Sequence, residues 1–233
     1  MLVLQHLRLS ATPTGVALAP HIWFDSKFLA ATELATVLNC VPQSNASEWY
    51  PCPRQEDKYP GKQCTKLSVQ STALQDVVNK LGATWGGALD TSTLTHLPIT
   101  RDEPDTTTSP GLRHAWHHDV FPERSADSAS PDATMVPDAT MVPYLSESDA
   151  DVPVDLSGAT IFPHANVTVE PRRGALLTWM NHDVAESTHG VGPYAGSGAR
   201  LVMHIPISFG ATPVALAEHV GCAGGPTSMI YSE

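Results

Sequence analysis

Residues 158–180 read GATIFPHANVTVEPRRGALLTWM, and this stretch contains the clearest fold signal in the chain. β-Branched and aromatic residues occur in three short runs, and turn-forming Pro, Asn and Gly separate the runs. A further run, ARLVMHIPISF, spans residues 199–209. Short runs with such punctuation are typical of antiparallel strands. The pattern predicts a sandwich or barrel.

Two earlier segments favour helices instead. Ser26 can cap KFLAATELATVL at residues 27–38, and Ser71 or Thr72 can cap ALQDVVNKL at residues 73–81. A few helices followed by many strands indicate an α+β, mainly β architecture. We therefore expect the N-terminal helices to pack outside the barrel.

The run at residues 199–209 predicts a strand with one apolar face and one mixed face. Its apolar face should pack under the outer helices and consists of Leu201, Met203, Ile205, Ile207 and Phe209. The opposite face carries Arg200, Val202, His204 and Ser208. Arg and His facing inward would imply a polar cavity within the barrel. For Arg200 alone, a surface salt bridge at a strand edge is the alternative.

Residues 122–155 have a different composition, rich in Pro, Ser, Asp and Ala, and contain PDATMVP followed at once by DATMVP. Such a composition rarely buries enough apolar surface to offset the entropy of ordering. We predict a flexible insertion. The alternative is a lid over a binding site.

Composition limits the partners. The 24 acidic residues outnumber the 13 Lys and Arg residues, so an anionic phosphate backbone would be repelled on average. No apolar run approaches the roughly 20 residues of a membrane span. We expect a soluble protein that binds neither nucleic acid nor membrane, and a cytoplasmic location by default.

The cysteines offer a different expectation for the compartment. Cys52 and Cys64 bracket the polar loop PCPRQEDKYPGKQC and could form a disulfide. A bridge there would favour a secretory compartment over the cytoplasm.

A histidine cluster is the main candidate site. Residues 111–121 read GLRHAWHHDVF, and on an extended strand His117 and Asp119 point to the same face while His118 points away. A third ligand must come from elsewhere, and we favour His189 over its rival His182. Two histidines and one carboxylate make the facial triad of non-haem Fe(II) oxygenases.

Together these motifs resemble the prolyl 4-hydroxylase-like 2-oxoglutarate/Fe(II) dioxygenases. The resemblance covers roughly residues 95–210 and rests on ordered motifs, namely GxxHxxHxD, GATIFPHANVTVEPRRGALLTW, STHG and GSGAR. It implies a double-stranded β-helix, or cupin-like jelly roll. We expect a single domain over residues 1–233, with residues 1–94 as a helix-containing support and residues 211–233 as a C-terminal tail.

The resemblance also implies roles for individual residues. His117, Asp119 and His189 would hold Fe(II), and Arg200 would bind the far carboxylate of 2-oxoglutarate. Family members often have a tyrosine, some residues before the first iron ligand, that hydrogen-bonds 2-oxoglutarate. In this chain His114 is the nearest polar candidate for that role. Trp116, Trp179 and His204 are candidates to line the substrate pocket, although large aromatic residues more often belong to a core. O₂ would be the second cosubstrate, and ascorbate could support turnover.

The implied reaction is hydroxylation of an unactivated C–H bond, with release of succinate and CO₂. The substrate would be a prolyl residue in a peptide, a free amino acid or a small natural product. The carboxylate ligand argues against halogenation, whereas desaturation, epoxidation and ring formation stay open. The alternatives from other classes are a cupin-like metal-binding isomerase and a non-catalytic binding jelly roll. Oligomeric state is not predicted.

Overall fold

The computed structural model describes residues 13–52, 62–69, 72–85, 96–105, 112–119, 121–122, 134–135 and 138–207. Ser208, Phe209 and the predicted tail at 211–233 lie outside these residues. Within the described ranges, no helix has both the length and the apolar character needed to cross a membrane.

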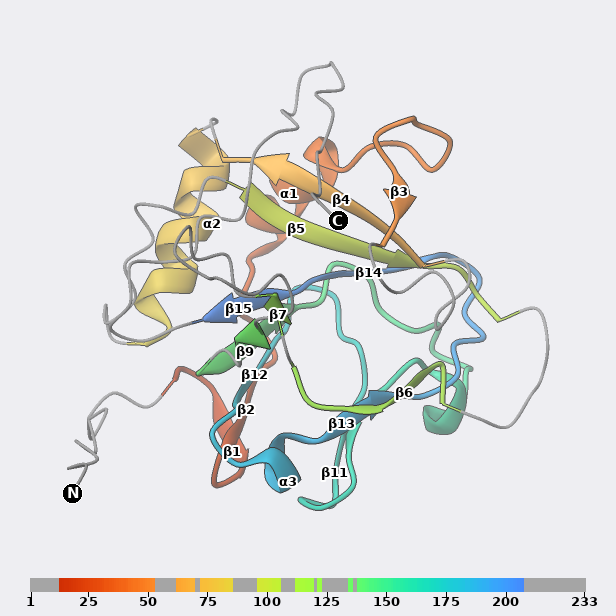
Figure 1. The fold of residues 1–233 in the computed structure, drawn as a ribbon. Coiled ribbons are helices and arrows are strands. Elements are labelled where there is room, and N and C mark those ends of the chain that lie inside the picture. The colour runs from red at the N-terminus through yellow and green to blue at the C-terminus, as the bar shows by residue number, and fades with distance from the viewer. Residues whose placement is uncertain are drawn as a thin grey trace.

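The described residues form short strands and a few helices (Figure 1). The helical segments are α1 (Ala31–Cys40), α2 (Thr72–Ala83), α3 (Val184–Ser187) and the 3₁₀ turn η1 (Val154–Leu156). The strands before the predicted insertion are β1 (Val16–Ala19), β2 (Ile22–Asp25), β3 (Tyr50–Pro51), β4 (Lys62–Ser68), β5 (His96–Asp102), β6 (His114–His117) and β7 (Phe121–Pro122). The later strands are β8 (Thr134–Met135), β9 (Ala139–Pro143), β10 (Thr160–Phe162), β11 (Val167–Val169), β12 (Leu176–Met180), β13 (His189–Val191), β14 (Arg200–Met203) and β15 (Ile205–Ile207).

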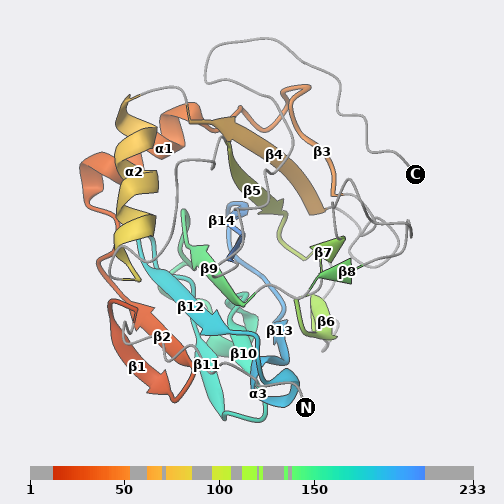
Figure 2. The ribbon, with the colours of Figure 1, turned by 60° about the vertical axis from the view of Figure 1, so that its left-hand side comes forward.

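These strands make antiparallel sheets with many crossovers. The largest sheet has the order β1-β2-β12-β9-β15, and two four-stranded sheets have the orders β11-β10-β13-β6 and β14-β5-β4-β3. β7 and β8 form a separate pair. In both views α1 and α2 lie near β4 at one end of the molecule, and β6 and β13 lie toward the other (Figures 1 and 2). The architecture is mainly β and jelly-roll-like.

Two apolar clusters fill the interior. One joins residues of α1, α2, β4 and β5 to one face of the largest sheet and includes Leu34, Val77, Leu97 and Met141. The other joins the opposite face of that sheet to β10 and β11 and includes Phe162 and Trp179. The largest sheet is thus covered on both faces, which explains why β9 and β12 are almost continuously apolar.

α1 begins later than the sequence predicts. It starts at Ala31 rather than near Ser26, because the Glu33 carboxylate reaches back and accepts a hydrogen bond from the Ala30 N–H at 2.6 Å. That hydrogen bond satisfies one of the exposed donors at the helix start. Glu33 also pairs with Lys80 of α2 at 2.7 Å, which joins the two helices.

The second copy of the repeated hexapeptide is not part of a flexible insertion. Residues 139–143 form β9, every one of them is buried, and the strand pairs with both β12 and β15. The prediction of flexibility over 122–155 is therefore wrong for this portion. The composition was misleading because Pro and Asp flank ATMVP. This short, mostly apolar segment is a buried strand with a partner on each side. Residues 123–133 lie outside the described part of the chain.

The N-terminal region contributes strands as well as helices. β1 and β2 extend the largest sheet, and β4 pairs along seven residues with β5. The boundary predicted near residue 95 therefore does not separate a support from a barrel. Strands as short as β1 and β2 carry little periodic signal, and their pairing with β12 becomes visible only in three dimensions.

The strand predicted over 199–209 divides at His204 into β14 and β15, which belong to different sheets. Its two faces separate as the alternation indicates: Met203 and Ile205 join the helix-side cluster, whereas Val202 joins the other.

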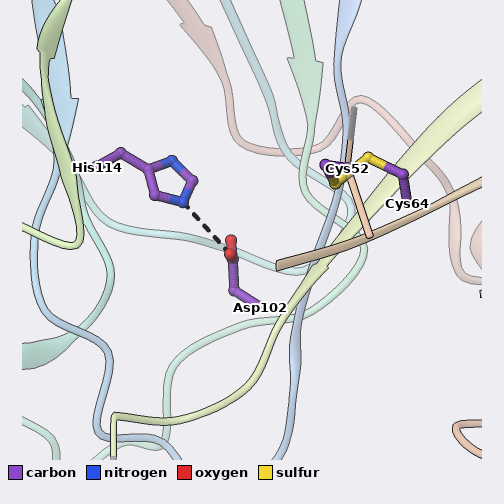
Figure 3. Close-up of a disulfide and its surroundings, with 4 residues drawn as sticks. All are labelled: Cys52, Cys64, Asp102 and His114. Carbon is purple, nitrogen blue, oxygen red and sulfur yellow. Dashed lines mark hydrogen bonds and ion pairs between the residues drawn. A yellow bond between two sulfur atoms is a disulfide. The ribbon is translucent and has the colours of Figure 1, made fainter. Parts of the chain in front are cut away.

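Cys52 and Cys64 form a disulfide that ties the end of β3 to β4 (Figure 3). Cys40 is also disulfide-bonded.

Candidate metal and anion site

Three candidate ligands meet at one point. His117 ends β6, Asp119 follows two residues later, and His189 begins β13. Antiparallel pairing of β13 with β6 sets His189 directly opposite His117. One ligand atom from each of the three residues lies within 4.8 Å of the others, a spacing that suits a shared metal ion.

Both imidazoles present the same nitrogen to this point. His117 Nδ1 donates to the Ala115 carbonyl at 2.7 Å, and His189 Nδ1 donates to the Ser187 carbonyl at 2.9 Å. A carbonyl only accepts, so each Nδ1 carries the proton and each Nε2 keeps its lone pair. The two Nε2 atoms lie 4.0 Å and 3.9 Å from Asp119 Oδ1.

Burial keeps these histidines neutral. Desolvation lowers the pKa of His117 and of His189, and the neighbouring His189 lowers the pKa of His117 further. The His189 ring lies against the aromatic rings of Phe162 and Trp179, with centroids 5.5 Å and 4.7 Å away. Neutral imidazole is the form that binds a metal.

The Asp119 carboxylate is held by two polar residues that the sequence did not indicate. Thr140 Oγ1, on β9, donates to Asp119 Oδ2 at 2.6 Å, and Asn181 Nδ2 donates to Thr140 Oγ1 at 2.9 Å. Burial by itself raises the pKa of Asp119, but His204, His189 and the Thr140 hydroxyl outweigh it and the net pKa is lowered. Oδ1 is left facing the imidazoles.

Replacing Thr140 by valine should therefore weaken metal binding. Valine keeps the shape but removes the donor that orients Asp119, and groups of this kind contribute about 10- to 100-fold to metal affinity. Calorimetric titration of the Thr140→Val protein with Fe(II) or Co(II) measures the loss. Thr140→Ser should restore most of the affinity, and equal affinity in all three proteins would contradict this role.

The other predicted site histidines lie in different places. His182 packs edge-on against His21, with ring centroids 4.4 Å apart, and is not in the ligand group. His204 does approach the site, because its Nε2 is 3.6 Å from Asp119 Oδ1. His204 thus adds a third imidazole beside the carboxylate.

The two candidate pocket tryptophans differ in their surroundings. Trp179 is buried in the core beside His189. Trp116 is 48% exposed and lies on the face of β6 opposite to His117. A Cβ on Gly190 would lie 2.9 Å from the Trp116 ring, so only glycine allows that ring to lie against β13.

Arg200 lies in a second buried cluster. It is 3% exposed, its NH1 contacts Asp102 Oδ2 at 3.3 Å, and its guanidinium carbon lies 5.8 Å from the Tyr144 ring centroid. Tyr144 in turn hydrogen-bonds Thr160 at 2.9 Å. Gly158 has φ +70°, and a Cβ there would come within 3.0 Å of Arg200 Cδ, so glycine makes room for the guanidinium. The alternative of a surface salt bridge is excluded.

His114 belongs to this cluster. Its Nε2 lies 3.3 Å from Asp102 Oδ1, on the side of the carboxylate away from the disulfide (Figure 3). Burial, together with the charge of Lys62, lowers the pKa of His114 to about 3, so the ring is neutral at pH 7. Burial alone would raise the pKa of Asp102, but the His114 hydrogen bond and the charges of Arg200 and Lys62 hold it well below its usual range.

Acid should destabilise the protein through His114. The pKa of a histidine is about 6.5 in the unfolded chain, whereas the pKa of His114 is about 3 in the folded protein. Between these two pH values the unfolded chain therefore binds a proton that the folded protein does not bind. Stability is therefore lost as pH falls through this window. By pH 4.5 the loss should reach about 2 kcal/mol. Urea unfolding at pH 6.5 and 4.5 should show this loss in the parent and a smaller one in His114→Gln, which keeps a donor.

The control for that measurement is the exposed His164. His164→Gln should lose as much stability on acidification as the parent. If His114→Gln does the same, His114 is not the group responsible.

Comparisons with known proteins place the fold in context. No family model and no curated protein sequence matches the chain. Among solved structures, the non-haem α-ketoglutarate-dependent epimerase SnoN from nogalamycin biosynthesis matches with TM-score 0.50 and 15% identity, over 79% of this chain and 76% of that one. A viral collagen prolyl hydroxylase from Paramecium bursaria Chlorella virus-1 matches with TM-score 0.49 and 15% identity, over 82% and 96%. A Pseudomonas putida prolyl-4-hydroxylase matches with TM-score 0.47 and 18% identity, over 79% and 91%.

Fold and site together define a jelly-roll-like protein with a His-Asp-His group suited to a metal ion. More particularly, the fold is similar to that of the non-haem α-ketoglutarate-dependent epimerase SnoN. The predicted resemblance is confirmed at the level of the fold.

Proposed function

We propose that this protein is a 2-oxoglutarate- and Fe(II)-dependent oxygenase. The observation that carries the proposal is the convergence of the His117, Asp119 and His189 ligand atoms, in a protein that also buries Arg200. Two imidazoles and one carboxylate on one side of a metal leave positions for a chelating 2-oxo acid and O₂.

The residues present fit both groups. For the metal, the two Nε2 lone pairs and Asp119 Oδ1 face one another. For the 2-oxo acid, Arg200 Nε is buried and has no hydrogen-bond partner within the described ranges. A buried donor without a partner costs free energy unless a ligand satisfies it. A carboxylate from the cosubstrate would do so.

The protein's own contribution is then binding and orientation. His117, Asp119 and His189 would hold Fe(II), and Thr140 keeps Asp119 turned toward it. Arg200 would bind the far carboxylate of 2-oxoglutarate and so set the direction of the chelating end. When bound, iron and 2-oxoglutarate supply the oxidising chemistry that activates O₂ toward a C–H bond.

We propose that the enzyme hydroxylates an unactivated C–H bond of its substrate. A prolyl residue in a peptide, a free amino acid or a small natural product are the candidate substrates, by resemblance to the family. Trp116, the exposed candidate for the substrate pocket, lies on the face of β6 opposite to His117 and so points away from the metal ligands. Trp116→Ala should therefore leave both the KM for the substrate and the Fe(II) affinity unchanged, and a raised KM would show that Trp116 contacts the substrate after all.

The test of the proposed function has two stages. Fe(II) and 2-oxoglutarate are first added without O₂, and the visible charge-transfer band of a chelated 2-oxo acid is expected. O₂ is then admitted, and succinate should form in amounts that follow the 2-oxoglutarate consumed. Absence of both band and succinate, with metal bound, would contradict the proposal.

One observation favours a second candidate function, a cupin-like metal protein without 2-oxoglutarate. His204 Nε2 lies nearer to Asp119 Oδ1 than either predicted ligand nitrogen does. A fourth protein ligand would occupy a position that the 2-oxo acid needs. In that case the protein should bind the metal, and His204→Ala should lower the metal affinity. The charge-transfer band should not appear when 2-oxoglutarate is added.

The disulfides support a proposal about location. Cys52, Cys64 and Cys40 are all disulfide-bonded, and structural disulfides persist in oxidising compartments. We propose a secretory compartment rather than the cytoplasm. Thiol labelling of the denatured protein from its own cells should find these cysteines blocked, and free thiols would contradict the location.

A further inference from the structure

The chain contains two triplets of the form Asn-x-Ser/Thr, the pattern that N-linked glycosylation requires. They read NAS at residues 45–47 and NVT at residues 166–168, and neither has Pro at its middle position. A glycan is bulky and hydrophilic, so the folded protein can carry one only where the Asn side chain reaches solvent. The position of each triplet in the fold therefore tests the pattern.

The second triplet begins at the tip of a hairpin. Residues 163–166 join β10 to β11, and Phe162 pairs with Val167 where the two strands meet the turn. The Asn166 N–H donates to the Pro163 carbonyl at 3.4 Å, and Asn166 has φ 52°, in the left-handed region. Asn adopts this conformation more readily than most other residues with a side chain. The backbone of Asn166 thus closes the turn.

Both polar side chains of this triplet point to solvent. Asn166 and Thr168 are exposed, whereas Val169 is buried and Val167 packs against the inner cluster that contains Phe162. Alternation along β11 accordingly puts Thr168 on the outer face of the sheet. No hydrogen bond within the described ranges uses the Asn166 side-chain amide. A group attached there would break none of the contacts that hold the hairpin.

The strand that follows the turn lies at the edge of its sheet. Among the described strands the order is β11-β10-β13-β6, so β11 has one paired and one free side. In both views β11 lies in the lower part of the molecule (Figures 1 and 2). The free backbone groups of an edge strand can pair with another chain. A hydrophilic glycan at the start of this strand would hinder such pairing.

The disulfides connect this surface with a compartment. Cys40, Cys52 and Cys64 are disulfide-bonded, and structural disulfides persist in the oxidising compartments through which secreted proteins pass. Asn-x-Ser/Thr triplets act as glycan acceptors in the surface loops of secreted proteins. The inference below rests on the secretory location proposed above and is independent of the oxygenase function.

We propose that Asn166 is a site of N-linked glycosylation. In the transfer, Asn166 Nδ2 forms a bond to the anomeric carbon of an oligosaccharide carried on a polyprenyl diphosphate. The bond from that carbon to the diphosphate oxygen breaks, the diphosphate leaves with the electron pair, and Nδ2 releases one proton. The secretory compartment supplies the donor and the transferase, and the attached glycan covers the free edge of β11.

The test identifies glycans on the protein isolated from its own cells. An amidase that releases N-linked glycans converts each modified Asn to Asp, and in isotope-labelled water it marks that Asp with heavy oxygen. Peptide mass spectrometry should find the mark at Asn166 in most molecules. Asn79 is also exposed, but Lys and Leu follow it, so it should stay unmarked and serves as the control for spontaneous deamidation. Asn45 is exposed as well, and its peptide is scored separately.

Replacements at Thr168, expressed in the same cells, test recognition without changing the acceptor. Thr168→Ala removes the hydroxyl that completes the triplet, so it should abolish the mark at Asn166 and lower the protein mass by one glycan. Thr168→Ser keeps a hydroxyl and should retain both. Asn166→Gly removes the acceptor amide while allowing the positive φ, and it should also lack the glycan. A Thr168→Ala protein that still carries the mark would overturn the assignment.

Thiol labelling of the same sample distinguishes the site from the location. If Cys52 and Cys64 are bridged and Asn166 is unmarked, the glycosylation site is wrong and the secretory location stands. If the cysteines are free and Asn166 is unmarked, the location fails and the site fails with it. Neither result changes the oxygenase assignment, because metal binding and succinate formation are measured separately.

Discussion

Replacing His189 by alanine is expected to abolish useful Fe(II) binding. The variant removes one of three ligand atoms that lie within 4.8 Å of one another, and its loss should exceed the roughly 100-fold that a supporting residue contributes. Anaerobic calorimetry with Fe(II), or with Co(II) as a redox-stable probe, measures the change. Succinate formation should disappear in parallel, because the metal would no longer be held.

The matched control is His182→Ala. His182 is the rival ligand seven residues earlier, and it contacts His21 instead of the site. Its replacement should leave the Fe(II) affinity unchanged. Because the His189 ring also packs against Phe162 and Trp179, urea unfolding of the metal-free proteins must accompany the titration. A folded His189→Ala protein that binds Fe(II) within threefold of the parent would exclude His189 as a ligand.

Arg200→Met should have two separate large effects. Loss of the guanidinium should weaken 2-oxoglutarate binding by about 10- to 100-fold, since a charge-assisted hydrogen bond to the far carboxylate would be lost. It should also destabilise the metal-free protein by about 3 kcal/mol, because Asp102 is fully buried and would lose a partner. Anaerobic titration and urea unfolding measure the two effects independently.

A double replacement separates these effects. In Arg200→Met combined with Asp102→Asn, the buried charge is removed with its partner, so much of the stability should return while 2-oxoglutarate binding stays weak. Arg200→Lys should retain part of the binding, since it keeps the charge but not the planar fork. If Arg200→Met binds 2-oxoglutarate as the parent does, the cosubstrate is held elsewhere.

Much of the metal site could be predicted from the sequence. On a strand, the spacing of His117 and Asp119 requires a shared face, and the ordered motifs around His189 and Arg200 resemble a known family. The tertiary fold brings the ligand atoms of His117, Asp119 and His189 together and buries Arg200 against Asp102. The fold class was predictable for a related reason: short β-rich runs with regular turns are a local property of the sequence.

The supporting residues could not be predicted in this way. Thr140 and Asn181 are 41 residues apart and meet only because β9 and β12 pair. Thr140 also lies in the repeated segment, whose composition pointed to a flexible loop. Lys62, Asp102 and Arg200 come from three strands that are distant in sequence, and each alone resembles an ordinary surface charge.

The sequence by itself determined the type of fold and the candidate ligands His117 and Asp119, because both depend on residue spacing along single strands. The third candidate, His189, was chosen through the family resemblance, and strand pairing places it opposite His117. Only the tertiary structure decided which copy of the repeat forms a core strand, which residue orients Asp119, and which charges surround Arg200. These depend on strand pairing across long separations and on burial. Burial is what makes the contact between Asp102 and Arg200 costly to break, whereas the same pair on the surface would contribute little.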